Sequence, residues 1–75
     1  MLLMAEIGYV WQAVAARIEQ DIASGVLPPG AMLMGERAMA QEYGVAITTV
    51  RRAVRDLRDR GVLVTLPAKG TFVAG

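Results

Sequence analysis

The sequence predicts an α+β fold that is mainly α, with three helices followed by a small β-hairpin. Two features of the pattern support this prediction. Up to about residue 60, apolar side chains recur every three or four positions, which is the period of an amphipathic helix. After Gly61 the pattern changes to short β-branched runs separated by turn residues. The length of 75 residues allows one small domain, which we place at residues 9–75, after an N-terminal extension at residues 1–8.

The first helix is expected at about residues 9–24. Its apolar stripe repeats every four residues and consists of Val10, Val14, Ile18 and Ile22. Gly25 follows as the residue that closes the helix in the left-handed conformation. The run from Pro28 to Gly30 predicts a turn, and residues 32–34 are expected to be extended after it. Three nearby methionines are expected to fill the core: Met32, Met34 and Met39.

A second, shorter helix is expected from Gly35 or Glu36 to Tyr43, and Gly44 ends it. Two residues then separate it from a third helix at about residues 47–60. The buried stripe of this third helix comprises Val50, Ala53, Val54 and Leu57. Helices joined by so short a glycine-containing turn are typical of a helix-turn-helix.

The end of the chain predicts a hairpin, because "VLVTL" and "TFVA" are two strand candidates with the turn residues "PAKG" between them. A hairpin packed behind a helix-turn-helix makes its winged version, and we call this hairpin the wing. Two interpretations of its tip, at residues 67–71, stay open. In an ordinary turn, Gly70 supplies positive φ and Lys69 provides solubility. In a functional wing, Lys69 meets a phosphate or the minor groove.

Composition disfavours an enzyme and any metal or cofactor site. Cys and His are both absent, which removes thiolate and imidazole ligands and the commonest general base. No apolar run reaches the roughly 18 residues that a membrane span needs. The start "MLLMAEIG" lacks the basic region and cleavage site of a secretory signal, so we expect a cytoplasmic protein.

Charge is distributed unevenly, although the formal net charge is only +1. Residues 1–46 carry two basic and five acidic side chains, a balance of −3, and residues 47–75 carry six basic and two acidic side chains, a balance of +4. The sequence therefore predicts one basic face, and the field of that face matters more than the total charge.

Five arginines fall between positions 51 and 60, on the third helix. Three ion pairs at i,i+4 would make this an ordinary solvated helix face: Arg52–Asp56, Arg55–Asp59 and Asp56–Arg60. Arg51 and Arg58 have no acid three or four positions away. Arg51 lies in the first turns beside Thr48 and Thr49, where groove entry on DNA needs donors for phosphates and guanine edges. Arg58 lies almost two turns further on, where we expect the helix to have left the groove.

Five segments give the chain a resemblance to a known family: "IASGVLPPGAML", "ERAMAQEYGV", "TTVRRAV", "LRDRGVL" and "KGTFV". In this order and spacing, across residues 9–73, they resemble the DNA-binding domain of the gluconate-repressor (GntR) family of bacterial transcription regulators. The resemblance implies a winged helix-turn-helix that binds a palindromic operator as a dimer. It also implies DNA contacts by Arg37, Thr48, Thr49, Arg51 and Gly70, together with the wing neighbours Lys69 and Thr71.

Three departures from the family pattern affect the expected contacts. Met34-Gly35 stands in place of Pro-Ser, so the second helix lacks a hydroxyl cap. Ala46-Ile47 stands in place of Ser-Arg, so Ile47 replaces a base-reading arginine. Ile47 either packs against the core or contacts a thymine methyl group. Arg52 replaces the usual Glu and adds a cation to the DNA side.

Two functions stay open at this point. The first is a sequence-specific regulator of transcription, a repressor, that reads the major groove of double-stranded DNA with the helix at about 47–60 and contacts the backbone or minor groove with the wing tip. The second is a protein-interaction module that keeps the fold without the DNA role. For the first we expect a weak homodimer, or one formed on DNA at the bacterial nucleoid, with contacts through the "MLLM" start and the first helix. Full family members carry a further effector-binding or oligomerisation domain after the wing, and the sequence identifies no effector.

Overall fold

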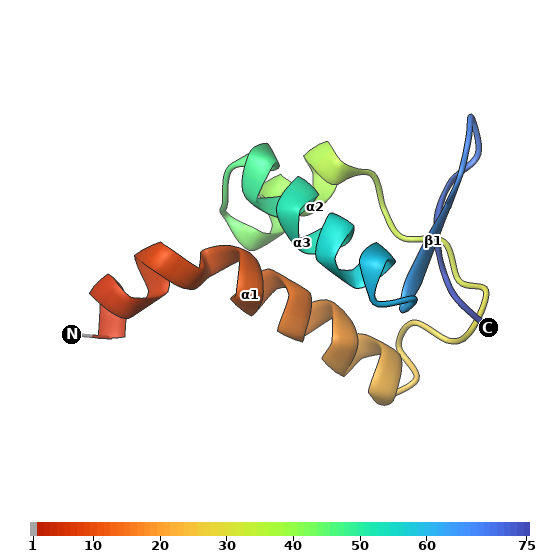
Figure 1. The fold of residues 1–75 in the computed structure, drawn as a ribbon, viewed down its shortest axis with the longest axis horizontal. Coiled ribbons are helices and arrows are strands. Elements are labelled where there is room, and N and C mark those ends of the chain that lie inside the picture. The colour runs from red at the N-terminus through yellow and green to blue at the C-terminus, as the bar shows by residue number, and fades with distance from the viewer. Residues whose placement is uncertain (1) are drawn as a thin grey trace.

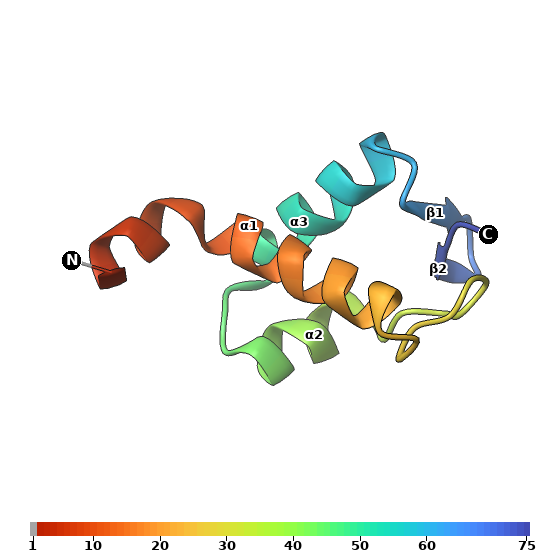
Figure 2. The same ribbon diagram turned by 90° about the horizontal axis from the view of Figure 1, so that it is seen from below.

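A computed structural model of the chain describes the backbone of residues 2–75 and the side chains from Val10 onward. The elements follow in the order α1 (Leu2–Ala23), α2 (Glu36–Tyr43), α3 (Ile47–Asp59), β1 (Leu63–Leu66) and β2 (Gly70–Val73). Helix α1 lies across one side of the α2–α3 pair in both Figure 1 and Figure 2, and the β-hairpin stands beyond the C-terminal end of α3. The predicted architecture of three helices and one antiparallel hairpin is confirmed.

The helix boundaries agree with the prediction except at the start of α1. Helix α1 begins at Leu2, so the predicted extension at residues 1–8 is helical from its second residue. The prediction was wrong here because it followed the apolar stripe, which starts at Val10, whereas the run "LLMAE" favours a helix by propensity alone. The side chains of residues 1–9, including the proposed dimer contact at "MLLM", lie outside the described residues. None of the described helices is long and apolar enough to cross a lipid bilayer.

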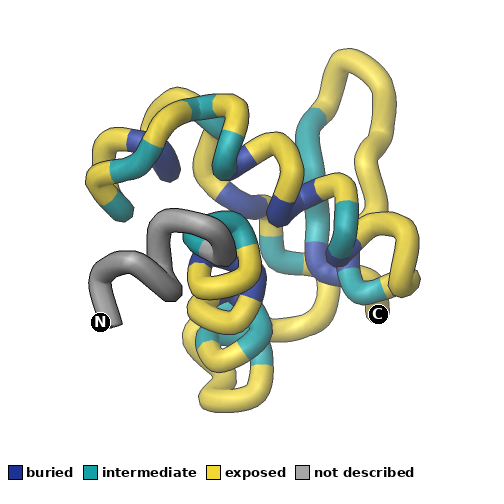
Figure 3. The backbone as a smooth tube through the Cα atoms, turned by 60° about the vertical axis from the view of Figure 1, so that its left-hand side comes forward, coloured by how far each residue is buried: buried dark blue, intermediate teal, exposed yellow. Residues whose placement is uncertain are grey.

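The core lies where the three helices and the base of the hairpin meet (Figure 3). Helices α1 and α3 supply most of its buried side chains: Val14, Ala15, Ile18, Val50, Ala53, Val54 and Leu57. Met39 is buried as predicted, but Met32 and Met34 are 59% and 51% exposed, so the prediction that they fill the core was wrong. Their segment is extended and side chains alternate along it, so Leu33 between them faces the core instead.

The wing is a two-stranded antiparallel ladder that runs from the pair Leu63–Val73 at its base to the pair Leu66–Gly70 at its tip. Both residues of the basal pair are buried in the core. The extended segment after the Pro28–Gly30 turn adds to the ladder, because the Leu33 N–H donates to the Thr71 carbonyl at 2.8 Å. Outside this base, residues 64–69 are exposed.

Candidate nucleic-acid interface

Helix α3 turns one side to the core and the other to solvent. Its apolar stripe is buried, so the residues opposite it form an exposed line along the helix, which we call the outer face: Thr48, Arg51, Arg52 and Arg55. These positions follow the i, i+3, i+4, i+7 spacing of neighbours on one side of a helix. The outer face therefore presents three guanidinium groups and one hydroxyl to solvent.

Arg51 is held by helix α2. Its Nε donates to Glu36 Oε1 at 3.0 Å, and the side chain is still 59% exposed. Glu36 lies in the first turn of α2. Among the described residues, the Nη1 and Nη2 groups of Arg51 make no hydrogen bond, so two parallel donors stay available to a phosphate or a guanine edge. The sequence prediction missed this pair because it considered acids on the same helix.

Arg52 does not form the predicted pair with Asp56. Its guanidinium lies over the Trp11 ring of α1, 4.7 Å from the ring centroid, which is a cation–π contact. Asp56 instead accepts from Arg60 at 2.9 Å, as the third predicted pair requires. Helix α1 therefore holds Arg52, whereas helix α2 holds Arg51.

The predicted pair between Arg55 and Asp59 is not among the ion pairs of the described residues. Arg55 lies seven positions after Thr48 and shares its side of α3, so it is a cation of the outer face that the sequence analysis had assigned to an intrahelical pair. Arg60, by contrast, bonds to Glu19 on α1 at 2.9 Å as well as to Asp56, and these hydrogen bonds raise the pKa of its guanidinium. Arg60 thus joins α1 to α3 rather than facing outward.

The other predicted contacts differ in exposure. Thr48 and Arg37 are exposed, whereas Thr49 is half-buried. Ile47 is also half-buried and packs against the core cluster, which favours the packing interpretation of this residue. Ala46 provides no side-chain hydrogen bond at the start of α3, as expected from the missing hydroxyl.

The wing tip is a tight turn with two unusual backbone positions. The Lys69 N–H donates to the Leu66 carbonyl at 3.0 Å, and Ala68 has φ 63 at the third position of this turn, where glycine is normally favoured. Gly70 has φ 137, and a Cβ at this position would lie 3.2 Å from Met32 Sδ. Gly70 is therefore required by the backbone, as the turn interpretation predicted, and Lys69 is left exposed at the tip.

A groove of about 340 Å³ separates the wing from α2 and α3. It brings together Lys69, Gly70 and Thr71 of the wing with Glu36 of α2, the carboxylate that holds Arg51. Arg37, Thr48 and Arg52 do not line this groove. The predicted site residues thus fall into two groups, one on the outer face of α3 and its flank and one along the wing.

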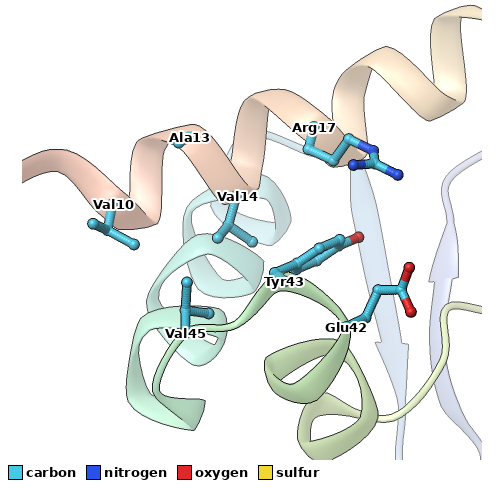
Figure 4. A pocket seen from close by; sticks show the side chains of 7 residues that line it. All are labelled: Val10, Ala13, Val14, Arg17, Glu42, Tyr43 and Val45. Carbon is cyan, nitrogen blue, oxygen red and sulfur yellow. The ribbon is translucent and has the colours of Figure 1, made fainter. Parts of the chain in front are cut away.

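A second hollow, of about 330 Å³, lies between α1 and α2 (Figure 4). Apolar side chains of α1 and Tyr43 form its walls, and Arg17 lies over the Tyr43 ring, 5.7 Å from the centroid. Burial and then the Asp21 carboxylate raise the pKa of the Tyr43 phenol. The residues that line this hollow belong to α1, α2 and the following turn, so it lies apart from the outer face of α3.

Comparisons with known proteins identify the family. The family model described as "Bacterial regulatory proteins, gntR family" matches residues 11–73. The chain is 39% identical over 64 residues to the mannosyl-D-glycerate transport/metabolism system repressor MngR of Escherichia coli (strain K12), which covers 85% of this chain and 27% of that protein. It is 32% identical over 65 residues to the HTH-type transcriptional repressor NagR of Bacillus subtilis (strain 168), which covers 87% of this chain and 27% of that protein. The chain thus spans about a quarter of the length of these relatives.

Solved structures support the same assignment. AraR(DBD) in complex with operator ORR3 matches with a TM-score of 0.81 and 33% identity, covering 85% of this chain and 77% of that chain. A transcriptional regulator from Oenococcus oeni matches with a TM-score of 0.84 and 32% identity, covering 88% of this chain and 55% of that chain. These proteins are regulators and not enzymes, in agreement with the prediction from composition. The chain belongs to the gntR family of bacterial regulatory proteins, and its three helices and hairpin form a winged helix-turn-helix.

Proposed function

We propose that this chain is the DNA-binding part of a bacterial transcription regulator that acts as a repressor. The observation that carries the proposal is the exposed side chain of Arg51, which Glu36 fixes through Nε while, among the described residues, neither Nη group makes a hydrogen bond. Family membership, the repressor relatives and the AraR(DBD) complex with its operator support the same function. In this function α3 enters the major groove of double-stranded DNA with its N-terminal turns leading.

The contacts divide by the chemistry of each side chain. Arg51 grips a guanine edge, and Thr48 and Arg52 bind phosphates or neighbouring bases. Arg37 lies one residue after Glu36, at the start of α2. Its side chain reaches the DNA phosphate backbone at the edge of the major groove. Along the wing, Lys69, Gly70 and Thr71 follow the backbone or the minor groove. Thr49 is half-buried and offers its hydroxyl to a phosphate beside Thr48, whereas Ile47 contributes mainly through packing.

The same function implies an assembly and a place of action. A domain of this size has a small footprint, so two copies that read the half-sites of a palindromic operator, about one helical turn apart, gain affinity through linkage. We propose a weak homodimer, or a dimer formed on DNA, that acts in the cytoplasm at the nucleoid. Sedimentation should show a mass that rises with concentration, and footprints should show paired protection.

The test of this function is the variant Arg51→Ala, assayed on duplexes selected from a random pool. Loss of a bidentate base contact should cost about 1–3 kcal/mol of specific binding, while the melting temperature stays unchanged. Arg17→Ala is the matched control, because Arg17 is similarly exposed, at 56% against 59%, but lies on α1 beside the second hollow. Equal affinities of wild type and Arg51→Ala would contradict the proposal and favour the protein-interaction module.

A further inference from the structure

A chain of hydrogen bonds joins α3 to both strands of the wing. Arg58 Nη1 donates to Thr65 Oγ1 at 2.9 Å, and Thr65 Oγ1 lies 2.9 Å from Thr71 Oγ1. Thr65 and Thr71 are register partners, one on β1 and the other on β2. One guanidinium near the end of α3 therefore holds the two strands together through a pair of hydroxyl groups.

These hydrogen bonds meet the wing close to its tip. The basal pair Leu63–Val73 is buried, whereas the pair Thr65–Thr71 is the last before the turn-closing pair Leu66–Gly70. Among the described residues, the bond from Arg58 is the side-chain hydrogen bond that joins α3 to the wing. Figure 1 shows the hairpin beyond the C-terminal end of α3, with its tip clear of the helices. Arg58 thus contacts the wing one pair below its turn, at the level where the Leu33 N–H also donates to the Thr71 carbonyl.

Arg58 is also free to make this contact. None of the ion pairs of the described residues involves it, and the neighbouring Asp56 carboxylate is engaged by Arg60. Arg58 follows Arg51 by seven residues, so the two lie on the same side of α3, about 10 Å apart along the helix. The distance between the base-reading arginine and the wing is therefore set partly through Arg58.

We propose that Arg58 is the positioning residue of the wing: through Thr65 and Thr71 it fixes the direction in which the tip carrying Lys69 points. This role rests on the proposed DNA-binding function, and it belongs to a residue that the sequence pattern alone places outside the interface. A wing held in its binding orientation before docking loses less conformational entropy when it meets the duplex. Arg58 acts through the wing and not as a phosphate contact of its own.

The first experiment uses the free protein. Amide hydrogen exchange of the wing is measured by NMR in Arg58→Met and in Thr65→Val, which breaks the chain without changing charge. Both variants should exchange the wing amides, including the turn-closing amide of Lys69, about threefold to fivefold faster than wild type, the factor for one exposed hydrogen bond. Arg55→Met is the matched control, because it removes the same charge from α3 and should leave the wing amides unchanged. Equal protection in all three variants would overturn the inference.

The second experiment measures affinity for a selected duplex. Arg58→Met and Thr65→Val should each weaken binding about threefold, and the double variant should be no weaker than either single variant. In a Lys69→Ala background both effects should become smaller, because the tip cation is the main wing contact whose position they set. A loss for Arg58→Met without one for Thr65→Val would assign Arg58 to a phosphate and overturn the positioning role. If the wild type bound no duplex, the proposed function would fail, and hydrogen exchange alone would decide the role of Arg58 in the wing.

Discussion

The two elements that we place on DNA are held to the domain in different ways. Helix α3 contributes a continuous buried stripe to the core: Val50, Ala53, Val54 and Leu57. The wing contributes one buried pair at its base, Leu63 and Val73. It is otherwise held by its own ladder, by backbone hydrogen bonds to residues 30–33 and by the hydrogen bond from Arg58. Apolar burial thus fixes the helix, and polar contacts close to solvent fix the hairpin.

This difference predicts how each element responds to substitution. An element that shares the core can move only when the domain unfolds, whereas an element with few buried contacts can open locally at much smaller cost. We therefore expect α3 to be a rigid reader and the wing to be an adjustable one. Substitutions in the two elements should differ in size and in how far their effects spread.

The largest effect is expected for Leu57→Ala in the buried stripe of α3. Leu57 is fully buried, so truncation leaves a cavity between α1 and α3 and should lower the free energy of unfolding by about 3 kcal/mol. Urea denaturation followed by circular dichroism measures this loss. Arg55→Ala on the outer face is the control and should change stability by less than about 0.5 kcal/mol. A loss below about 1 kcal/mol for Leu57→Ala would show that α3 does not depend on the core.

A smaller effect is expected for Gly70→Ala in the wing. The φ of 137 at this position is rarely adopted by residues with a Cβ, so the substitution should cost about 2 kcal/mol. Amide chemical shifts should change along residues 63–73 and leave α3 unaffected. The double variant with Met32→Ala removes the side chain that the new Cβ would meet at 3.2 Å. Full rescue by Met32→Ala would assign the cost to crowding instead of backbone strain.

Ile47→Ala tests how the first turn of α3 packs against the core. Ile47 is half-buried against the core, so its truncation should lower the free energy of unfolding by about 1 kcal/mol and leave base preference unchanged. Thermal denaturation and selection from a random duplex pool measure the two quantities on one variant. The opposite outcome, unchanged stability with relaxed preference at one base pair, would assign Ile47 to a thymine methyl group.

The smallest effect is expected for Ala68→Gly at the wing tip. Glycine relieves the positive φ of 63, but it also gives the unfolded chain more freedom, so stability should rise by about 0.5 kcal/mol. Differential scanning calorimetry measures the change. Ala74→Gly, at an exposed position without positive φ, is the control and should lower stability slightly. A loss of stability for Ala68→Gly would mean that the turn carries no strain.

Periodicity predicted most of the fold, because the stripe of α3 and the β-branched runs of the wing report burial directly. It failed where burial did not determine structure: helix α1 extends to Leu2 on propensity, and Met32 and Met34 alternate outward from an extended segment. The site was predicted less completely than the fold. Residue types identified the basic helix, but the partners of Arg51 and Arg52 lie on other helices, at Glu36 and Trp11. Contacts between elements depend on how the helices pack against each other. The residue pattern along a single helix does not contain this information.

The bond between Glu36 and Arg51 also bears on how a regulator finds its site among competing sequences. A carboxylate beside the leading guanidinium offsets part of its attraction to phosphates, so fewer counterions are released when α3 meets arbitrary duplex. In the DNA complex that we propose, the two Nη donors gain a guanine edge at the correct site while the carboxylate stays on Nε. Weak binding to non-specific DNA lets the protein move along the duplex. The base contact of Arg51 then contributes a larger part of the affinity for the operator.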